Sequence, residues 1–158
     1  MGALLYFAYG SNLDVDQMRT RCPTARPLVS ARLRDHRLEF THLSRRWGGG
    51  AADILPHPGE SVWGALYALD PDDLEKLDRC EGGYERQQVR VEEEDGEVRS
   101  AVTYTVRSKA SFAPTEEYVS KLLRWGEHWE LPHAYLARLH DLRCIPAADR
   151  PPGRGGPC

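Results

Sequence analysis

Glu81 is a candidate for proton transfer because of its place in the sequence. It follows residues 77–80 (Leu-Asp-Arg-Cys) and precedes two glycines. Because glycine commonly follows the last residue of a helix, this pattern is typical of a carboxylate at a helix C-terminus. The negative end of the helix dipole disfavours a further negative charge. If Glu81 is also buried, we expect its pKa to be raised, so that it could exchange protons near neutral pH. The competing interpretation is an ordinary exposed glutamate before a glycine stop.

A second segment, residues 9–13 (Tyr-Gly-Ser-Asn-Leu), could bind an anion through its main chain. It lies between an apolar stretch, residues 4–9, and a helix start at Asp14. A strand-to-helix junction leaves several backbone N–H groups unpaired in one place. Such groups can bind a carboxylate or stabilise an oxyanion without a charged side chain, and Gly10 would let the backbone approach a ligand closely. The competing interpretation is a plain turn with an Asn or Asp cap.

Other reactive residue types give weaker patterns. Cys80 beside Glu81 could be a thiol nucleophile, but no sequence feature places a histidine next to it as a base. No Cys-x-x-Cys pair occurs among the cysteines, so free thiols are expected rather than a structural zinc site. The histidines show neither His-x-x-x-His nor His-Glu-x-x-His spacing. We therefore expect no metal and no cofactor.

The composition narrows the function classes. The formal net charge of the 158 residues is −3, which argues against a nucleic-acid partner, because such proteins need a basic face. No apolar run approaches the roughly 18–20 residues that cross a bilayer. The stretch 3–8 is too short for the core of a signal peptide and lacks a basic leader. A cytoplasmic location, with no membrane or nucleic-acid partner, is the expectation.

The elements that must position Glu81 and the 9–13 loop come early in the chain. A buried strand over 4–9 and a helix over 14–21 flank the loop. Short alternating stretches predict strands over 27–34, 36–42, 51–55 and 61–69, with a break at Pro56 and Pro58. Asp70 as a cap and Pro71 at the first turn predict a helix ending near Cys80. This helix would present Glu81 at its C-terminus.

The second half of the chain predicts a hairpin followed by helices. Residues 86–93 and 98–107 read as strands joined by a turn. Apolar spacing that includes Tyr118 predicts a helix over 115–129, and a further helix follows to about residue 142. Many short strands with helices inserted late predict an α+β fold: a mixed, barrel-like β-sheet with a few surrounding helices. We expect one domain over 1–145 and a disordered Pro/Gly/Arg tail over 146–158.

Taken together, the segments resemble the γ-glutamylcyclotransferase family, which includes AIG2-like and BtrG-like proteins. Residues 6–13 (Tyr-Phe-Ala-Tyr-Gly-Ser-Asn-Leu) are similar to the N-terminal signature of the family, and 77–82 to the segment that holds its catalytic glutamate. Residues 131–135 (Leu-Pro-His-Ala-Tyr) resemble the helix that carries a further ligand tyrosine. The resemblance covers about residues 4–143, in the order of the family.

The resemblance implies an enzyme that converts γ-glutamyl compounds to 5-oxoproline by intramolecular aminolysis, without a cofactor. Glu81 would be the general acid/base. The glutamyl moiety of a small-molecule substrate would be bound by a set of loop and pocket residues: Tyr6, Tyr9, Gly10, Ser11, Asn12, Leu13 and Tyr135.

Several alternatives stay open at this point. The substrate could be a γ-glutamylamine or an antibiotic side chain, which needs the same chemistry. The chain could also be a non-catalytic AIG2-like binding protein that kept the fold. The oligomeric state is equally open, and a homodimer could form through an exposed strand edge or the Trp-bearing helix.

Overall fold

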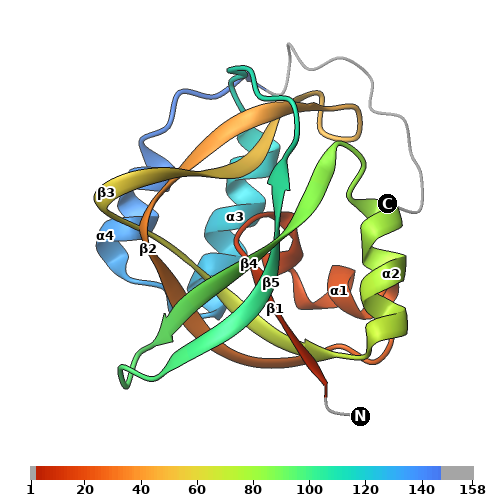
Figure 1. Ribbon diagram of the computed structural model, residues 1–158. Helices are drawn as coiled ribbons and strands as arrows, with labels where there is room; N and C mark the ends of the chain where they lie inside the picture. Colours follow the sequence, from red (N-terminus) through yellow and green to blue (C-terminus); the bar gives the residue numbers. More distant parts are fainter. Residues whose placement is uncertain (1–2, 147–158) are drawn as a thin grey trace.

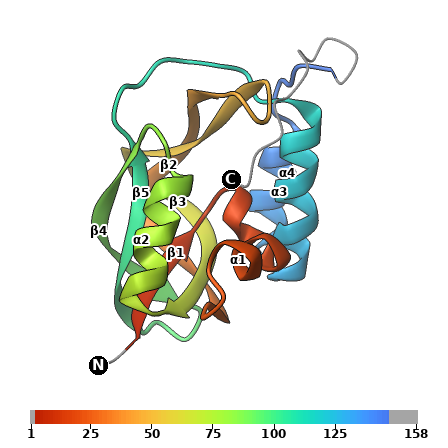
Figure 2. The ribbon, with the colours of Figure 1, turned by 90° about the vertical axis from the view of Figure 1, so that its right-hand side faces the viewer.

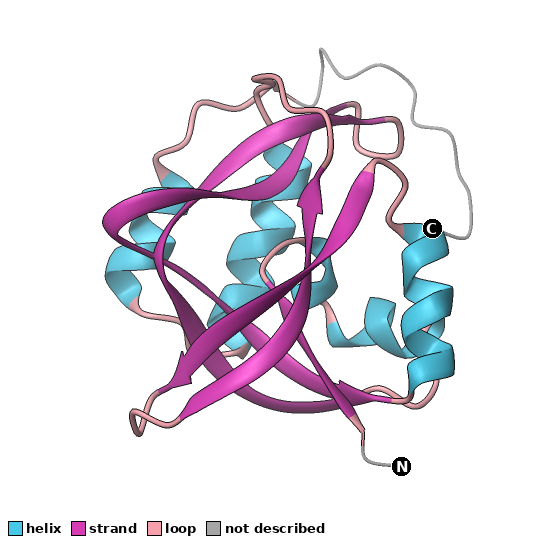
Figure 3. Cartoon of the chain, viewed as in Figure 1, coloured by secondary structure: helices cyan, strands magenta, loops and turns pink. Residues whose placement is uncertain are grey.

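The computed structural model describes residues 3–146, and Figures 1 and 3 show the arrangement of its elements. The N-terminal half holds β1 (Leu4–Ala8), the short 3-10 helix η1 (Ser11–Leu13), α1 (Val15–Arg21), β2 (Arg26–Ser44) and β3 (Gly49–Leu69). The C-terminal half holds α2 (Pro71–Cys80), β4 (Tyr84–Glu93), β5 (Val98–Val106), α3 (Glu116–His128) and α4 (His133–His140).

The strands close into a barrel in the order β1-β3-β2-β4-β5. Neighbouring strands are antiparallel except at the closure, where β1 and β5 run parallel with Tyr6 opposite Val102. The pairings that complete the barrel are short: one residue pair joins β1 to β5, and two residue pairs join β2 to β4. The expected α+β fold with a mixed, barrel-like sheet is confirmed. The expected tail over 146–158 lies almost wholly outside the described residues, and the domain boundary stays a prediction.

The strand boundaries expected in the first half were wrong in one respect. β2 and β3 are each continuous where two shorter strands were expected. The expected interruption in β2 is a register shift between Arg34 and His36 rather than a break. β3 passes through Pro56 and Pro58, which are exposed. A proline lacks the N–H for a ladder bond, but this part of β3 pairs with β2 alone, since β1 reaches only residues 65–69.

Helix α2 is fixed to the barrel through an apolar stripe and a buried acid. Leu74 and Leu77 are almost fully buried on one face of the helix. Asp73, 2% exposed, accepts hydrogen bonds from the main chain and the hydroxyl of Thr24, both at 2.7 Å. Asp70 precedes the helix as expected, although its side chain makes no capping hydrogen bond. These contacts set where the end of α2, and therefore Glu81, lies.

Helix α1 lies between α2 and α3, as both views of the ribbon show (Figures 1 and 2). A buried lysine of α3, Lys121, connects α3 to α1. Its Nζ donates to Gln17 Oε1 at 2.7 Å and forms a salt bridge with Asp14, the N-cap of α1, at 3.1 Å. Helix α4 packs beside α3. No helix within residues 3–146 is long and apolar enough to cross a membrane.

Replacing Leu77 by alanine tests how firmly α2 is held. Leu77 is 0% exposed, so its truncation leaves a cavity under the helix. We expect the free energy of unfolding to fall by about 2–5 kcal/mol in chemical denaturation. Leu43→Ala is the matched control, because Leu43 is 54% exposed and its loss should change stability by less than about 0.5 kcal/mol. Equal effects of the two variants would contradict this packing.

Candidate active site

A small cavity of about 120 Å³ opens where the end of β1, η1 and the end of α2 meet. Sites for drug-sized ligands measure roughly 300–1,000 Å³, so this cavity suits a ligand closer in size to an amino acid. Its lining is polar and rich in tyrosine. The residues are Tyr6, Tyr9, Gly10, Ser11, Asn12, Arg21, His42, Ser44, Arg46, Trp47, Ala51, Ala52, Cys80, Glu81, Gly82, Tyr84, Tyr104 and Tyr118.

Glu81 is the acid of this cavity. It caps the C-terminus of α2, and the main-chain N–H of Tyr84 donates to its carbonyl at 3.0 Å, which fixes the turn. Its side chain is 15% exposed. The carboxylate Oε1 accepts a hydrogen bond from Asn12 Nδ2 at 3.1 Å and lies 3.9 Å from Arg21 Nη1. Two segments 69 residues apart in the sequence, the loop and the end of α2, therefore meet at this carboxylate.

Burial raises the pKa of Glu81 to about 7. The positive charge of Arg21 and the hydrogen bond from Asn12 act in the opposite direction, and the nearby carboxylate of Asp78 adds to the rise. Burial, which the sequence analysis made a condition for a raised pKa, is the largest of these effects. A carboxyl group half-ionised near neutral pH can both accept and donate a proton.

The loop opposite Glu81 is compact because of Gly10. A Cβ at this position would lie 3.2 Å from both the methyl group of Ala52 and the hydroxyl of Tyr118. The hydroxyl of Tyr118 accepts a hydrogen bond from the main-chain N–H of Ala52 at 3.1 Å. Within residues 3–146 no group accepts a hydrogen bond from this hydroxyl, so its proton is available to an acceptor in the cavity. Burial raises the pKa of Tyr118 to about 12, so it stays protonated at neutral pH.

The other tyrosines around the cavity have fixed hydroxyl groups. Tyr6 accepts from Asn12 Nδ2 at 2.9 Å, and Tyr9 donates to the carbonyl of Tyr104 at 2.5 Å. Tyr84 donates to the carbonyl of Ala52 at 2.7 Å, and Tyr104 donates to Asp78 at 2.6 Å. Each ring is therefore anchored by the backbone at one end and by its hydroxyl hydrogen bond at the other. Side chains fixed in this way suit a site that must bind a small ligand in one orientation.

A sequence model of the family described as "Gamma-glutamyl cyclotransferase, AIG2-like" matches residues 6–125, more than two thirds of the chain. This chain belongs to that family. The mouse protein named gamma-glutamylcyclotransferase is 32% identical over 143 residues, which cover 85% of this chain and 76% of the mouse protein. The human protein of the same name is 32% identical over 145 residues, covering 87% and 77%.

Solved structures agree with the family membership. A structure titled "Gamma-glutamyl cyclotransferase" superimposes with a TM-score of 0.87 at 30% identity, covering 90% of this chain and 89% of that one. A human protein described as uncharacterized gives the same TM-score at 31% identity, covering 92% and 90%. The barrel and the helices around it are thus the fold of γ-glutamyl cyclotransferases.

Most of the residues that the resemblance implied do line the cavity, and two do not. Tyr6, Tyr9, Gly10, Ser11, Asn12 and Glu81 are brought together. Leu13 is buried and does not line the cavity, and its main-chain N–H donates to the carbonyl of Gly10 at 3.0 Å. Tyr135, which the resemblance placed in the pocket, lies on α4 among core residues and does not line the cavity.

Tyr118 and Arg21 line the cavity and were missed by the sequence analysis. Tyr118 was placed in the apolar stripe of its helix, and its ring is indeed buried. The available signal was its position in the first turn after Thr115, which caps α3 through a hydrogen bond to the N–H of Tyr118 at 3.2 Å. Arg21 could have been suspected because it ends a short helix just before Cys22-Pro23, where a basic side chain interacts with the helix dipole.

Little in the described residues would hold a metal at this site. Glu81 is the carboxylate that lines the cavity. Within residues 3–146, the acidic side chains close enough to share a cation are Glu93, Asp95 and Glu97 at the β4–β5 turn, where Arg99 already pairs with the two glutamates. The expectation of free thiols holds for Cys22 and Cys144 and is wrong for Cys80, which is disulfide-bonded. A bonded sulfur cannot act as the thiolate nucleophile considered for Cys80.

Proposed function

We propose that this protein is a γ-glutamylcyclotransferase, which converts γ-glutamyl amino acids or amines to 5-oxoproline and the free amine. The observation that carries the proposal is one buried carboxyl group, Glu81, with a pKa near 7, that faces the 9–12 loop across a cavity sized for a small ligand. The relatives named gamma-glutamylcyclotransferase support it.

The first task of the site is to fold the substrate. The α-amino group must approach the γ-carbonyl of the same glutamyl moiety before a five-membered ring can form. Orienting two groups of one molecule in this way can contribute about 7–11 kcal/mol to catalysis. We assign this positioning to the main chain of Gly10, Ser11 and Asn12 together with the rings of Tyr6 and Tyr9, which line the cavity.

The second task is to move one proton from nitrogen to nitrogen. The α-amine attacks in its neutral form, and as its nitrogen bonds to the γ-carbon, the carboxylate of Glu81 accepts a proton from that nitrogen. The protonated Glu81 then donates the proton to the leaving nitrogen as the old C–N bond breaks, and the carboxylate is restored. A group with a pKa near the working pH is suited to both steps. No group besides the substrate and Glu81 needs to supply or take up a proton.

The third task is to stabilise the negative oxygen of the tetrahedral intermediate. Donors fixed in advance stabilise such an oxyanion strongly. The main-chain N–H groups of Gly10 and Asn12 and the hydroxyl of Tyr118 are the donors that we propose, whereas the N–H of Ser11 already donates to the Tyr118 hydroxyl. The amide of Leu13 is left out because it donates to Gly10.

Release of 5-oxoproline from a panel of substrates tests the function. The panel holds γ-glutamyl amino acids, γ-glutamyl amines and, as a matched control, α-glutamyl dipeptides, whose free γ-carboxylate offers no amide to cleave by this route. We expect release from γ-linked compounds only, and the preferred leaving amine will separate the amino-acid and amine alternatives. Binding of 5-oxoproline without turnover of any γ-linked compound would contradict the proposal and favour a non-catalytic binding protein.

The pH dependence of kcat/KM reports the state of Glu81 in the free enzyme. Since the carboxylate form must accept the first proton, activity should fall as Glu81 becomes protonated. We expect kcat/KM to decrease about tenfold per pH unit below pH 7, with a midpoint near 7. The measurement is a profile from pH 5 to 9 with one γ-glutamyl substrate. An acid limb with its midpoint near 4, the value of an ordinary glutamate, would contradict a buried catalytic Glu81.

The remaining sequence expectations belong to this proposal as predictions. They are a cytoplasmic location, a small-molecule partner without nucleic acid or membrane, catalysis without an added metal, and an oligomeric state that light scattering would measure.

A further inference from the structure

We propose that Arg21 is a positioning residue for Glu81: it fixes the orientation of the Asn12 amide that binds the Glu81 carboxylate, and it places a positive charge 3.9 Å from that carboxylate. The inference rests on the proposed function for its catalytic meaning. Its structural content, an Arg21–Asn12–Glu81 unit, can be tested without turnover.

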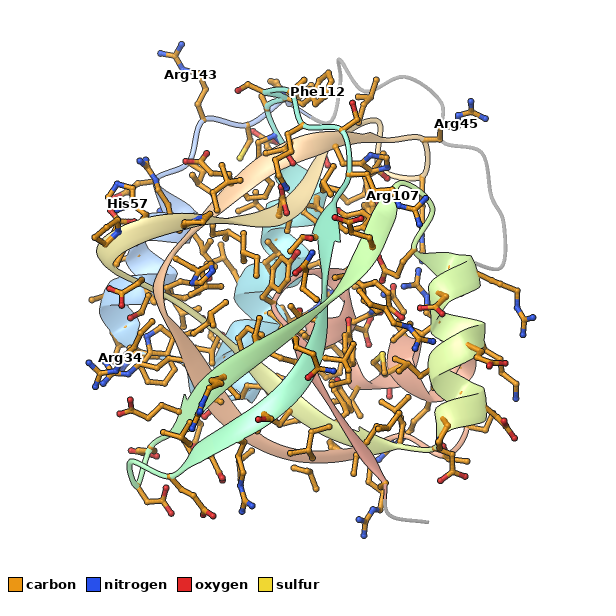
Figure 4. The ribbon with its side chains drawn as sticks, in the orientation of Figure 1. Arg34, Arg45, His57, Arg107, Phe112 and Arg143 are labelled. Atoms are coloured by element: carbon orange, nitrogen blue, oxygen red, sulfur yellow. The ribbon has the colours of Figure 1, made fainter. Side chains whose placement is uncertain are left out.

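The burial of Arg21 is unusual for an arginine and needs a reason. Its side chain is 7% exposed, whereas arginines such as Arg34, Arg45 and Arg143 extend away from the body of the molecule (Figure 4). Its Nε is buried and finds no hydrogen-bond partner within the described residues. Burying a charge costs free energy unless the charge is paired. Glu81, 3.9 Å away, is the carboxylate that pairs with it.

Arg21 determines which way the Asn12 amide points. Arg21 Nη1 and Gln17 Nε2 both donate to Asn12 Oδ1 at 2.9 Å. On the other side, Asn12 Nδ2 donates to Tyr6 at 2.9 Å and to Glu81 at 3.1 Å. A rotated amide would place its NH₂ group against the donors of Arg21 and Gln17. Only one orientation therefore satisfies the amide, and that orientation directs an N–H at Glu81.

A second line of hydrogen bonds holds this unit from behind. Gln17 is itself fixed, because it accepts from the buried Lys121 at 2.7 Å and donates to Ser11 Oγ at 3.0 Å. Helix α1, between α2 and α3, thus supplies both donors to Asn12. The Glu81 carboxylate is therefore connected through the side-chain amide of Asn12 to α1, and through Gln17 to Lys121 of α3.

Two other charged groups near Glu81 and Arg21, Asp78 and Lys121, have partners of their own. Asp78 accepts from Arg86 and Tyr104, and Lys121 pairs with Asp14. The groups that share the cavity with Glu81, or interact with Glu81 or Arg21 from the surrounding elements, are His42, Arg46 and the phenols of Tyr6, Tyr9, Tyr84, Tyr104 and Tyr118. Arg21 is the cation whose salt bridge to Glu81 the structure shows. In agreement, Arg21 holds the pKa of Glu81 below the value that burial alone would give.

Removing this charge should move the titration of Glu81 to higher pH. An opposite charge 4–6 Å away typically changes a pKa by about 1–3 units, so Arg21→Gln should raise the midpoint by about one unit or more. The midpoint is measured directly on the Glu81 side-chain carboxyl carbon by ¹³C NMR, with Glu81→Gln to assign the signal. In parallel, the acid limb of kcat/KM should shift by the same amount.

Two further variants separate the charge from a general disturbance of the helix. Arg19→Gln removes the same charge from the same helix turn, but Arg19 is exposed, so its titration should match the wild type. Arg21→Lys keeps a positive charge and should keep the midpoint near the wild-type value. It also provides the test if Arg21→Gln does not fold, since Arg21→Lys with a shifted midpoint would overturn the proposal.

An unchanged Glu81 titration in folded Arg21→Gln would overturn the inference, even if turnover falls. The two proposals fail separately. If the wild type releases no 5-oxoproline but the NMR midpoint moves in Arg21→Gln, the proposed function fails and the unit stands. If the wild type is active and the midpoint does not move, the function stands and the role of Arg21 is lost.

Discussion

Glu81→Gln should lower kcat for 5-oxoproline release by about 10²–10⁴-fold, the usual loss when a general acid/base is removed. The amide has nearly the same shape and can still accept the hydrogen bond that Asn12 makes to Oε1. It cannot accept a proton from the attacking nitrogen and return it to the leaving one. The fold and the binding of 5-oxoproline should therefore persist, which circular dichroism and calorimetric titration would measure.

Glu85→Gln is the control for this variant. It makes the same chemical change four residues away, on a side chain that is exposed and does not line the cavity. Its kcat should stay within about twofold of the wild type, because surface substitutions of this kind leave the structure largely unchanged. Wild-type turnover by Glu81→Gln would remove Glu81 from the mechanism.

Tyr118→Phe should have the second largest effect, a loss of about 10²–10³ in kcat if its hydroxyl donates to the developing oxyanion. The ring is buried, and within residues 3–146 no group accepts a hydrogen bond from its hydroxyl, so the proton is left for the cavity. The substitution removes one donor and little volume. Steady-state kinetics with a γ-glutamyl amino acid would measure the loss, which should appear in kcat more than in KM.

Tyr135→Phe makes the same change at the tyrosine that the family resemblance placed in the pocket. Tyr135 lies on α4 and does not line the cavity, so this variant should keep wild-type kcat. If Tyr135→Phe lost activity and Tyr118→Phe kept it, the structural assignment of the cavity tyrosine would be wrong and the sequence-based one right.

The comparison of these tyrosines shows what sequence could provide for the site. The loop and Glu81 carry local signals, a turn after a strand and a carboxylate before two glycines, but these signals left a plain turn and an exposed glutamate open, and the family resemblance singled them out. Tyr118 carries only a helical spacing signal, which equally describes a core residue. That its hydroxyl reaches Ala52 and the loop depends on how α3 packs against β3, a contact between positions 66 residues apart.

The same limit applies to the fold. Helix α2 was predictable from Asp70, Pro71 and its two leucines, and the β4–β5 hairpin from its polar turn. The continuity of β3 was not, because Pro56 and Pro58 normally interrupt a strand. Only the pairing scheme, in which that part of β3 has β2 as its one neighbour, explains why the strand tolerates both.

The burial of charge was the least predictable feature. Arg21 and Lys121 look like surface residues at the ends or faces of helices, and sequence gives no sign that Asn12 and Gln17 connect them. The pKa of Glu81 depends on this arrangement, since burial raises it and Arg21 with Asn12 lowers it. The family resemblance indicated Glu81 as the candidate acid, while the pKa of its carboxyl group is a property of the assembled cavity.

A crystal structure with 5-oxoproline bound would test the central claim most directly. The account predicts the ring in the cavity between the 9–12 loop and Glu81, with its nitrogen within about 3.2 Å of the Glu81 carboxyl group, as proton transfer requires. Its γ-carbonyl oxygen should face the loop amides and the hydroxyl of Tyr118. A ring bound elsewhere, or bound with its nitrogen turned away from Glu81, would contradict the account.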